Sequence, residues 1–92
     1  MIRSFCCVDT QSLFETGKSR RFAAFLRIAT RKLVQLDNAN ELRDLASPPG
    51  NRLERLRGDR VGQHSIRVND QFRICFVWTT QGPEDVEIVD YH

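Results

Sequence analysis

The sequence predicts an α+β fold of two layers, in which N-terminal helices pack on one face of a twisted antiparallel β-sheet. Two patterns indicate this fold. Apolar residues between positions 20 and 37 recur at steps of three and four, which is the spacing of one helix face. Apolar residues between positions 66 and 88 alternate with polar ones, which is the spacing of strands. The helix is therefore the expected cover for the apolar face of the sheet.

The N-terminal half is expected to form one strand and two helices. Residues 2–7 are predicted as a short strand, and Asp9 or Thr10 as the cap of a short helix that ends near Gly17. Ser19 is predicted to cap a longer helix over about residues 20–37. The apolar stripe of this helix comprises Phe22, Leu26, Ala29, Leu33 and Leu36, with Phe25 beside it. The opposite face, with Arg20, Arg27 and Arg31, is interpreted first as a solvated surface and second as a binding surface.

The C-terminal half is expected to form a meander of strands. Residues 41–46 suit one helical turn, and residues 47–51 interrupt regular structure. Asn69-Asp70 is predicted as a two-residue hairpin turn because both residue types tolerate positive φ, and residues 81–84 as a second turn. If the even-numbered residues from 66 to 88 face the core, the uncovered face carries Arg67, Arg73, Cys75, Glu87, Val89 and Tyr91.

Length and composition indicate a single folded domain over residues 1–92, because 40% of the residues are hydrophobic and 28% are charged. No apolar run approaches the roughly 20 residues of a membrane span, and the first residues lack the pattern of a signal peptide. A cytoplasmic protein without membrane contact is therefore expected. Cys6, Cys7 and Cys75 form no CxxC pair, so they are interpreted as packing residues rather than as a disulfide framework or a zinc site.

The positive charges fall in two runs, although the net charge is only +2. The first run covers residues 18–32 and contains no acid, and the second covers residues 52–73. Twelve of the fourteen basic residues are arginine, whose guanidinium makes bidentate contacts with phosphate. This composition favours nucleic acid or another phosphate-bearing partner, with an ordinary solvated surface as the alternative.

Two features of the strand region suggest chemistry. Asp90-Tyr91-His92 places an acid, a phenol and an imidazole directly after a strand-like run, either as a site or as a solvated tail. Arg73 lies in the middle of an otherwise apolar strand, where a guanidinium requires a carboxylate or a phosphate. Pairing with Glu87 is the structural alternative, and contact with a scissile phosphate is the functional one. His64 is interpreted as structural.

Several segments together resemble the HigB toxins of the RelE/ParE superfamily, which belong to bacterial type II toxin–antitoxin systems. They are Ile2-Arg3-Ser4-Phe5, Leu13-Phe14-Glu15-Thr16-Gly17, residues 52–59, residues 65–74 and Asp90-Tyr91-His92. The resemblance implies a metal-independent endoribonuclease without a cofactor, which cuts messenger RNA in the ribosomal decoding site. It also implies a HigA-like antitoxin with a helix-turn-helix, through which alone the toxin reaches operator DNA. The implied active site is Asp90, Tyr91 and His92, with Arg73 on the phosphate.

The chain departs from the family pattern at Glu54, where many members have histidine. Glu54 is either a base in this protein or dispensable, and the neighbouring cations make up the lost positive charge. The residues expected to bind the RNA backbone are Arg52, Arg55, Arg57, Arg60 and Arg67. Two rival functions remain open: a ParE-like inhibitor of DNA gyrase on the same fold, and a non-enzymatic RNA-binding module.

Overall fold

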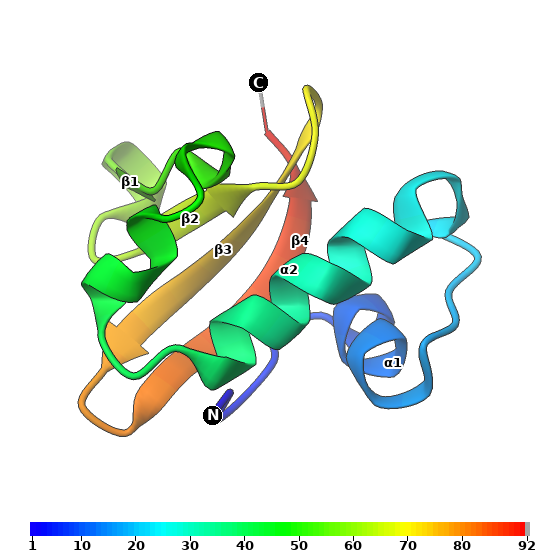
Figure 1. The fold of residues 1–92 in the computed structure, drawn as a ribbon, viewed down its shortest axis with the longest axis horizontal. Coiled ribbons are helices and arrows are strands. Elements are labelled where there is room, and N and C mark those ends of the chain that lie inside the picture. Colours follow the sequence, from blue (N-terminus) through cyan, green and yellow to red (C-terminus); the bar gives the residue numbers. More distant parts are fainter. Residues whose placement is uncertain (92) are drawn as a thin grey trace.

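A computed structural model shows two helices packed on one face of a four-stranded antiparallel sheet (Figure 1). It describes residues 1–91, and the predicted site residue His92 lies outside the described residues. The helices are α1 (Val8–Thr16) and α2 (Leu26–Asn38). The strands are β1 (Glu54–Arg55), β2 (His64–Arg67), β3 (Phe72–Thr79) and β4 (Gly82–Asp90), in the spatial order β1-β2-β3-β4. The predicted α+β class is confirmed.

The first helix ends as predicted but begins differently. Gly17 adopts a left-handed conformation at φ 74°, and its N–H donates to the Leu13 carbonyl over 2.8 Å. The predicted cap is wrong, because Cys7 precedes the helix and no side chain caps it. Thr10 is instead buried, and its hydroxyl accepts a hydrogen bond from the Ile88 N–H at 3.0 Å. This bond ties α1 to β4.

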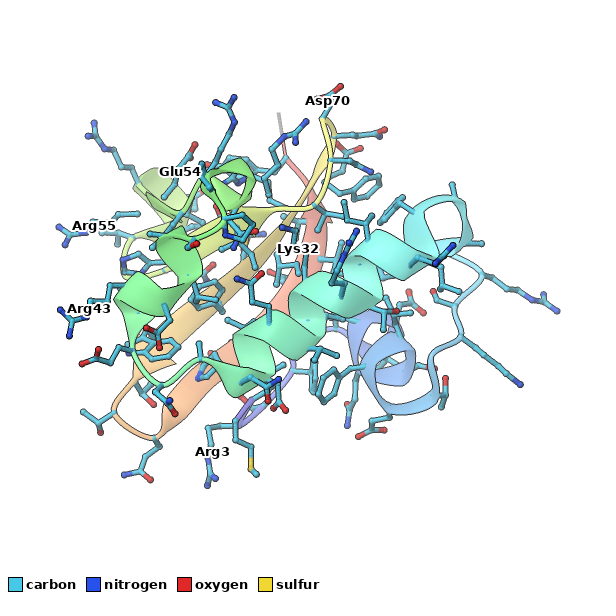
Figure 2. All side chains as sticks on the ribbon, in the orientation of Figure 1. Arg3, Lys32, Arg43, Glu54, Arg55 and Asp70 are labelled. Carbon is cyan, nitrogen blue, oxygen red and sulfur yellow. The ribbon has the colours of Figure 1, made fainter. Side chains whose placement is uncertain are left out.

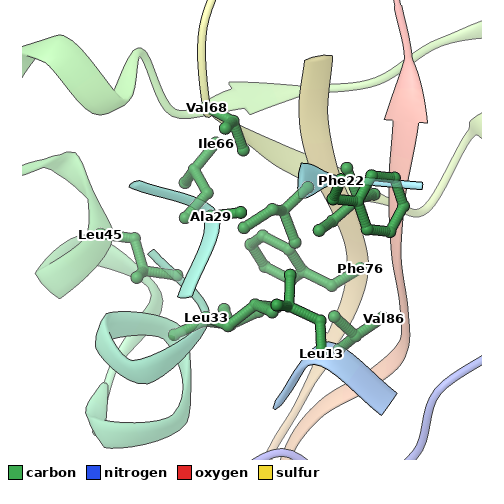
Figure 3. Packing of buried hydrophobic residues seen from close by; sticks show 12 residues of the cluster. Leu13, Phe22, Ala29, Leu33, Leu45, Ile66, Val68, Phe76 and Val86 are labelled. Atoms are coloured by element: carbon green, nitrogen blue, oxygen red, sulfur yellow. The ribbon is translucent and has the colours of Figure 1, made fainter. Parts of the chain in front are cut away.

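The second helix is shorter than predicted. A 3₁₀ turn over Ala23–Phe25 precedes α2, and the Ser19 hydroxyl accepts from the Phe22 N–H at 3.2 Å. The break lets the Phe25 ring stack on Phe72 of β3, with ring centroids 4.6 Å apart. The apolar stripe nevertheless faces the sheet as predicted, and Phe22, Ala29, Leu33 and Leu36 are fully buried (Figure 3).

The segment predicted as a first strand forms only one isolated bridge, in which Phe5 pairs with Val86 in parallel orientation. Arg3 and Cys6 also donate backbone hydrogen bonds to β4. β4 is irregular here, because Asp85 has φ 53° and the register with β3 shifts between Cys75 and Val77. The irregular edge explains why pairing does not extend into a strand.

The two hairpin turns differ from their predictions. Positive φ is not observed at Asn69 or Asp70; instead, the Asn69 side-chain oxygen accepts from the N–H groups of Gln71 and Phe72 at 2.9 and 2.8 Å. The second turn lies at residues 80–81, one residue earlier than expected, and β4 begins at Gly82. A Cβ at Gly82 would lie 2.2 Å from the Met1 carbonyl oxygen, so only glycine fits. The predicted helical turn is confirmed as a 3₁₀ helix over Leu42–Ala46.

The core lies between α2 and the sheet. The even-numbered residues that alternation predicts for the core include Ile66, Val68, Ile74, Phe76, Val86 and Ile88, each at most 1% exposed. Phe72 and Trp78 of the same set are partly buried against them. The other face was predicted to be uncovered, which is wrong for two of its residues. Cys75 is fully buried and Arg73 is only 8% exposed, because residues 52–63 fold over this part of the sheet. No helix within residues 1–91 combines the length and apolarity that crossing a membrane requires.

Candidate functional site

A polar hollow opens where β2, β3 and the end of β4 meet. Its volume is about 310 Å³, and we call it the arginine hollow. It is lined by Arg52, Arg67, Asn69, Asp70, Arg73 and Tyr91. Three arginines in one concave surface form a cationic site, and Asp70 is the one acid among the lining residues.

Strand pairing brings these residues together. Phe72 pairs with Asp90, and the Tyr91 N–H donates to the Gln71 carbonyl at 2.8 Å, so β4 ends beside the β2–β3 turn (Figure 1). The Gln71 side-chain amide also donates to the Asp90 carboxylate at 2.9 Å. Two of the three predicted terminal residues, Asp90 and Tyr91, therefore lie at the arginine hollow or next to it.

Two arginines face each other across β2 and β3 in this site. Arg67 and Arg73 are direct partners in the antiparallel register, an arrangement in which like charges oppose folding. Arg67 is ion-paired with Asp70 on the turn between the strands. An anion bound between the two guanidiniums would remove the remaining repulsion.

The Arg73 guanidinium is held by uncharged oxygens. Its Nε donates to the Ser65 hydroxyl at 2.7 Å, and its Nη2 donates to the carbonyls of Ser65, at 3.3 Å, and Arg52. Its Nη1 lies 4.0 Å from a carboxylate oxygen of Glu54. The Glu54 side chain is 53% exposed, so this long ion pair is screened by water and neutralises little of the charge.

The predicted alternative in which Arg73 pairs with Glu87 is wrong. Glu87 accepts instead from Arg60 at 2.8 Å, and both side chains are largely buried. Arg60 also donates to Gln63 at 3.1 Å and lines neither hollow described here. The structure therefore does not bring Arg60 together with the other predicted RNA-binding arginines.

A second hollow adjoins the first. It has a volume of about 510 Å³ and is lined by Glu54, Arg55, Leu56, Arg57 and Tyr91. Tyr91 lines both hollows and is 38% exposed. Glu54 and Arg55 project outward from the short edge strand β1 (Figure 2). The two hollows together contain all the predicted site residues of the described chain except Asp90 and Arg60.

Sequence reasoning missed several residues around the arginine hollow. Asn69 and Asp70 were interpreted only as a turn, although they line the hollow. Ser65 carried no signal, because a serine in a strand is unremarkable until its partner is known. Lys32 reaches from α2 to the buried Asn51, next to Arg52, and burial with the nearby cations Arg31 and Arg67 lowers its pKa.

His64 and Cys6 also have shifted pKa values. Burial, and then the charge of Arg55, lower the pKa of His64, whose ring stacks on Phe76 with centroids 6.3 Å apart. Burial and the neighbouring Glu87 raise the pKa of the Cys6 thiol to about 11, although Cys6 is exposed and not a packing residue as predicted. Within residues 1–91, His, Cys, Asp and Glu side chains form no group of three or more suited to a metal ion.

Comparison with known proteins identifies the family. A sequence model of the RelE-like HigB toxins of type II toxin–antitoxin systems matches residues 9–92. The chain belongs to the HigB-like toxin family. It is also 54% identical over 48 residues to Toxin HigB-1 of Vibrio cholerae serotype O1, a segment covering 52% of this chain and 50% of that protein. The aligned region thus spans half of the relative.

Proposed function

We propose that this HigB-like toxin is a ribosome-dependent endoribonuclease, which cleaves messenger RNA in the decoding site and so inhibits translation. Family membership and the cationic arginine hollow support this function. The observation that carries it is the environment of Arg73. Neutral oxygens fix this guanidinium in place, so its charge remains available to an incoming phosphate.

The proposed reaction uses the substrate's own 2′-hydroxyl as the nucleophile. The 2′-oxygen loses its proton to a base and attacks the adjacent phosphorus in line. The bond to the 5′-oxygen breaks, and that oxygen receives a proton from an acid. The products are a 2′,3′-cyclic phosphate and a 5′-hydroxyl end. Arg73 stabilises the charge that develops on the non-bridging oxygens.

The carboxylates and the terminal residues supply the proton transfers. Glu54 lies beside Arg73 and, with Asp90 and His92, provides the candidates for base and acid. Tyr91 lines both hollows, a position that suits stacking on a splayed base. Arg52 and Arg67 on one side, and Arg55 and Arg57 on the other, contact the flanking RNA backbone. Arg60 is left out of this surface because Glu87 neutralises it.

The remaining parts of the proposal concern the cell. The protein acts in the cytoplasm as one domain over residues 1–92, without a metal ion or membrane contact. A HigA-like antitoxin with a helix-turn-helix neutralises it and carries it to operator DNA. The ribosome aligns the substrate, so cleavage of free message is expected to be much slower than cleavage on the ribosome.

Primer extension tests the function. Purified toxin is mixed with messenger RNA in the presence and absence of 70S ribosomes. Cleavage only with ribosomes, blocked by a 2′-deoxy substitution at the scissile nucleotide, is the expected result. Uncut message in both reactions, together with inhibition of gyrase supercoiling, would establish the ParE-like alternative instead.

A further inference from the structure

Ser65 supplies two of the oxygen atoms that hold the Arg73 guanidinium. The hydroxyl accepts from Nε at 2.7 Å, and the carbonyl accepts from Nη2 at 3.3 Å. The Arg52 carbonyl is the third acceptor. We call these three oxygens the Arg73 cradle. The cradle does not use Nη1, which lies 4.0 Å from a carboxylate oxygen of Glu54. Arg73 itself lines the arginine hollow.

Burial makes the cradle necessary. Ser65 is fully buried and Arg73 is 8% exposed, so water cannot satisfy the N–H donors on the inner side of the guanidinium. A guanidinium carries five such donors, and leaving one buried without an acceptor is costly. The acceptors of the cradle carry no formal charge. They fix the orientation of Arg73 without neutralising its positive charge.

The sheet register explains why this serine serves Arg73. Ser65 pairs directly with Cys75, which places Arg73 two residues away on the same face of β3. Diagonal neighbours of this kind lie within reach of a long side chain. A small side chain at position 65 also leaves room for the guanidinium to lie over it, and a hydroxyl adds the acceptor that Nε requires.

We propose that Ser65 is a positioning residue, whose hydroxyl aims Arg73 at the phosphate bound in the arginine hollow. This inference rests on the proposed nuclease function, since the aim of Arg73 matters only if a phosphate is there to receive it. Ser65 does not touch the RNA itself. Loss of the Ser65 hydroxyl leaves the charge of the site unchanged and alters only the orientation of the Arg73 guanidinium.

The test compares Ser65→Ala with Ser65→Thr in single-turnover cleavage on programmed 70S ribosomes. Ser65→Ala is expected to lower the cleavage rate by roughly ten- to a hundredfold, the usual cost of losing a hydrogen bond to a charged group. Ser65→Thr retains the hydroxyl on a residue that suits a strand, and is expected to recover most of the rate. In an Arg73→Ala background, Ser65→Ala is expected to add no further loss.

A matched control separates positioning from folding. Cys75→Ala also truncates a fully buried side chain, on the residue that pairs with Ser65, but leaves the cradle in place. It is expected to keep the cleavage rate within about threefold of wild type. The NMR signal of the Arg73 Nε–H provides a readout independent of RNA: slow solvent exchange in wild type and Ser65→Thr, and fast exchange in Ser65→Ala.

The outcomes are distinguishable. A Ser65→Ala protein that cleaves at the wild-type rate overturns the positioning role and leaves the nuclease function intact. A loss in the Ser65→Ala/Arg73→Ala double variant equal to the product of the single losses also overturns it, because Ser65 would then act independently of Arg73. A wild-type protein that never cuts message contradicts the nuclease function, and the positioning role falls with it.

Discussion

Arg73 of β3 and Arg60, which packs against the same face of the sheet, show opposite ways of accommodating a guanidinium that is shielded from water. Arg60 donates to the carboxylate of Glu87 at 2.8 Å, so its charge is cancelled within the protein. Arg73 donates to one hydroxyl and two carbonyls, and its only carboxylate neighbour in the described chain is the half-exposed Glu54 at 4.0 Å. The first arrangement stabilises the fold, whereas the second retains a fixed positive charge for a ligand.

Burial of an arginine therefore does not by itself indicate function. The type of hydrogen-bond acceptor determines whether the charge is available to a ligand. A carboxylate neutralises the guanidinium, whereas neutral oxygens leave its charge uncompensated. The same reasoning applies to Arg67, which faces Arg73 across the strands and is paired with the exposed Asp70. Each pair can be tested by changing one member.

Replacing Arg73 should have the largest effect on cleavage. We expect Arg73→Ala to lower the single-turnover rate on programmed ribosomes by about 100- to 1000-fold, the usual cost of removing a transition-state donor. Arg73→Lys keeps the charge but loses the fork, so it should recover only part of the rate. The matched control, Arg60→Ala, should stay within about threefold of wild type at a temperature where it is folded. Equal losses in both variants would remove the distinction between the two sites.

Replacing Arg60 should affect the stability of the fold more than it affects cleavage. Arg60→Ala leaves the Glu87 carboxylate, whose side chain is 23% exposed, without its partner. We expect the free energy of unfolding to fall by about 1–3 kcal/mol, measured by urea denaturation. The double variant Arg60→Ala/Glu87→Gln should regain part of that loss, because no unpaired charge remains. A double variant whose loss is the sum of the single losses would show that the pair is not coupled.

The reactivity of the Cys6 thiol reports on the charge of Glu87, the partner of Arg60. The thiol pKa of about 11 lies above the usual 9.0 because of burial and then Glu87, so the folded protein retains the thiol proton at pH 8. Allowing for the higher nucleophilicity of a more basic thiolate, alkylation by iodoacetamide should be about tenfold slower than for the unfolded chain. Glu87→Gln should accelerate it modestly. Peptide mass spectrometry of Cys6 measures both rates, and an unchanged rate in Glu87→Gln would mean that the charge of Glu87 does not contribute to the raised pKa.

Replacing Arg52 should have the smallest effect, and it separates two contributions of one residue. The carbonyl of Arg52 belongs to the Arg73 cradle, and its side chain lines the arginine hollow. Its backbone is left-handed, with φ 45° and ψ 55°. Arg52→Gly should therefore be more stable than Arg52→Ala by about 1 kcal/mol, because glycine adopts this conformation without strain. Thermal unfolding measures this difference. Equal stability of the two variants would mean that residue 52 leaves the left-handed conformation when it is alanine.

The salt dependence of RNA binding tests the Arg52 side chain separately. Arg52→Gly and Arg52→Ala should each reduce the slope of log K, the RNA-binding constant, against log salt concentration by about 0.7, the value for one phosphate contact on a single strand. An unchanged slope would place the Arg52 guanidinium outside the RNA-binding surface.

The core could be predicted from sequence because it depends on periodicity. The stripe of α2 and the alternation of β2, β3 and β4 identified residues such as Leu33, Ile66 and Ile74, which the fold buries completely. The opposite face could not be predicted in the same way. Alternation shows that Arg73 and Cys75 share a side but does not reveal that the irregular segment 52–63 covers them.

The candidate site was predictable in some of its residues but not in their pairings. Arg73, Asp90 and Tyr91 stood out as polar groups within or after apolar strands. The partner of Arg73 did not, because two of its three acceptors are backbone carbonyls, which leave no trace in a sequence. Glu87 was an equally reasonable partner by residue type, and only the observed contact with Arg60 excludes it.

Sulfur substitution at the scissile phosphate tests whether the Arg73 guanidinium contacts that phosphate. Each phosphorothioate diastereomer of the message is cleaved on 70S ribosomes by wild type, Arg73→Ala and Arg60→Ala. If the guanidinium of Arg73 contacts one non-bridging oxygen, sulfur at that oxygen slows wild type and Arg60→Ala, and this slowing disappears in Arg73→Ala. A thio effect of the same size in all three proteins would contradict the account, because Arg73 would then not touch the phosphate.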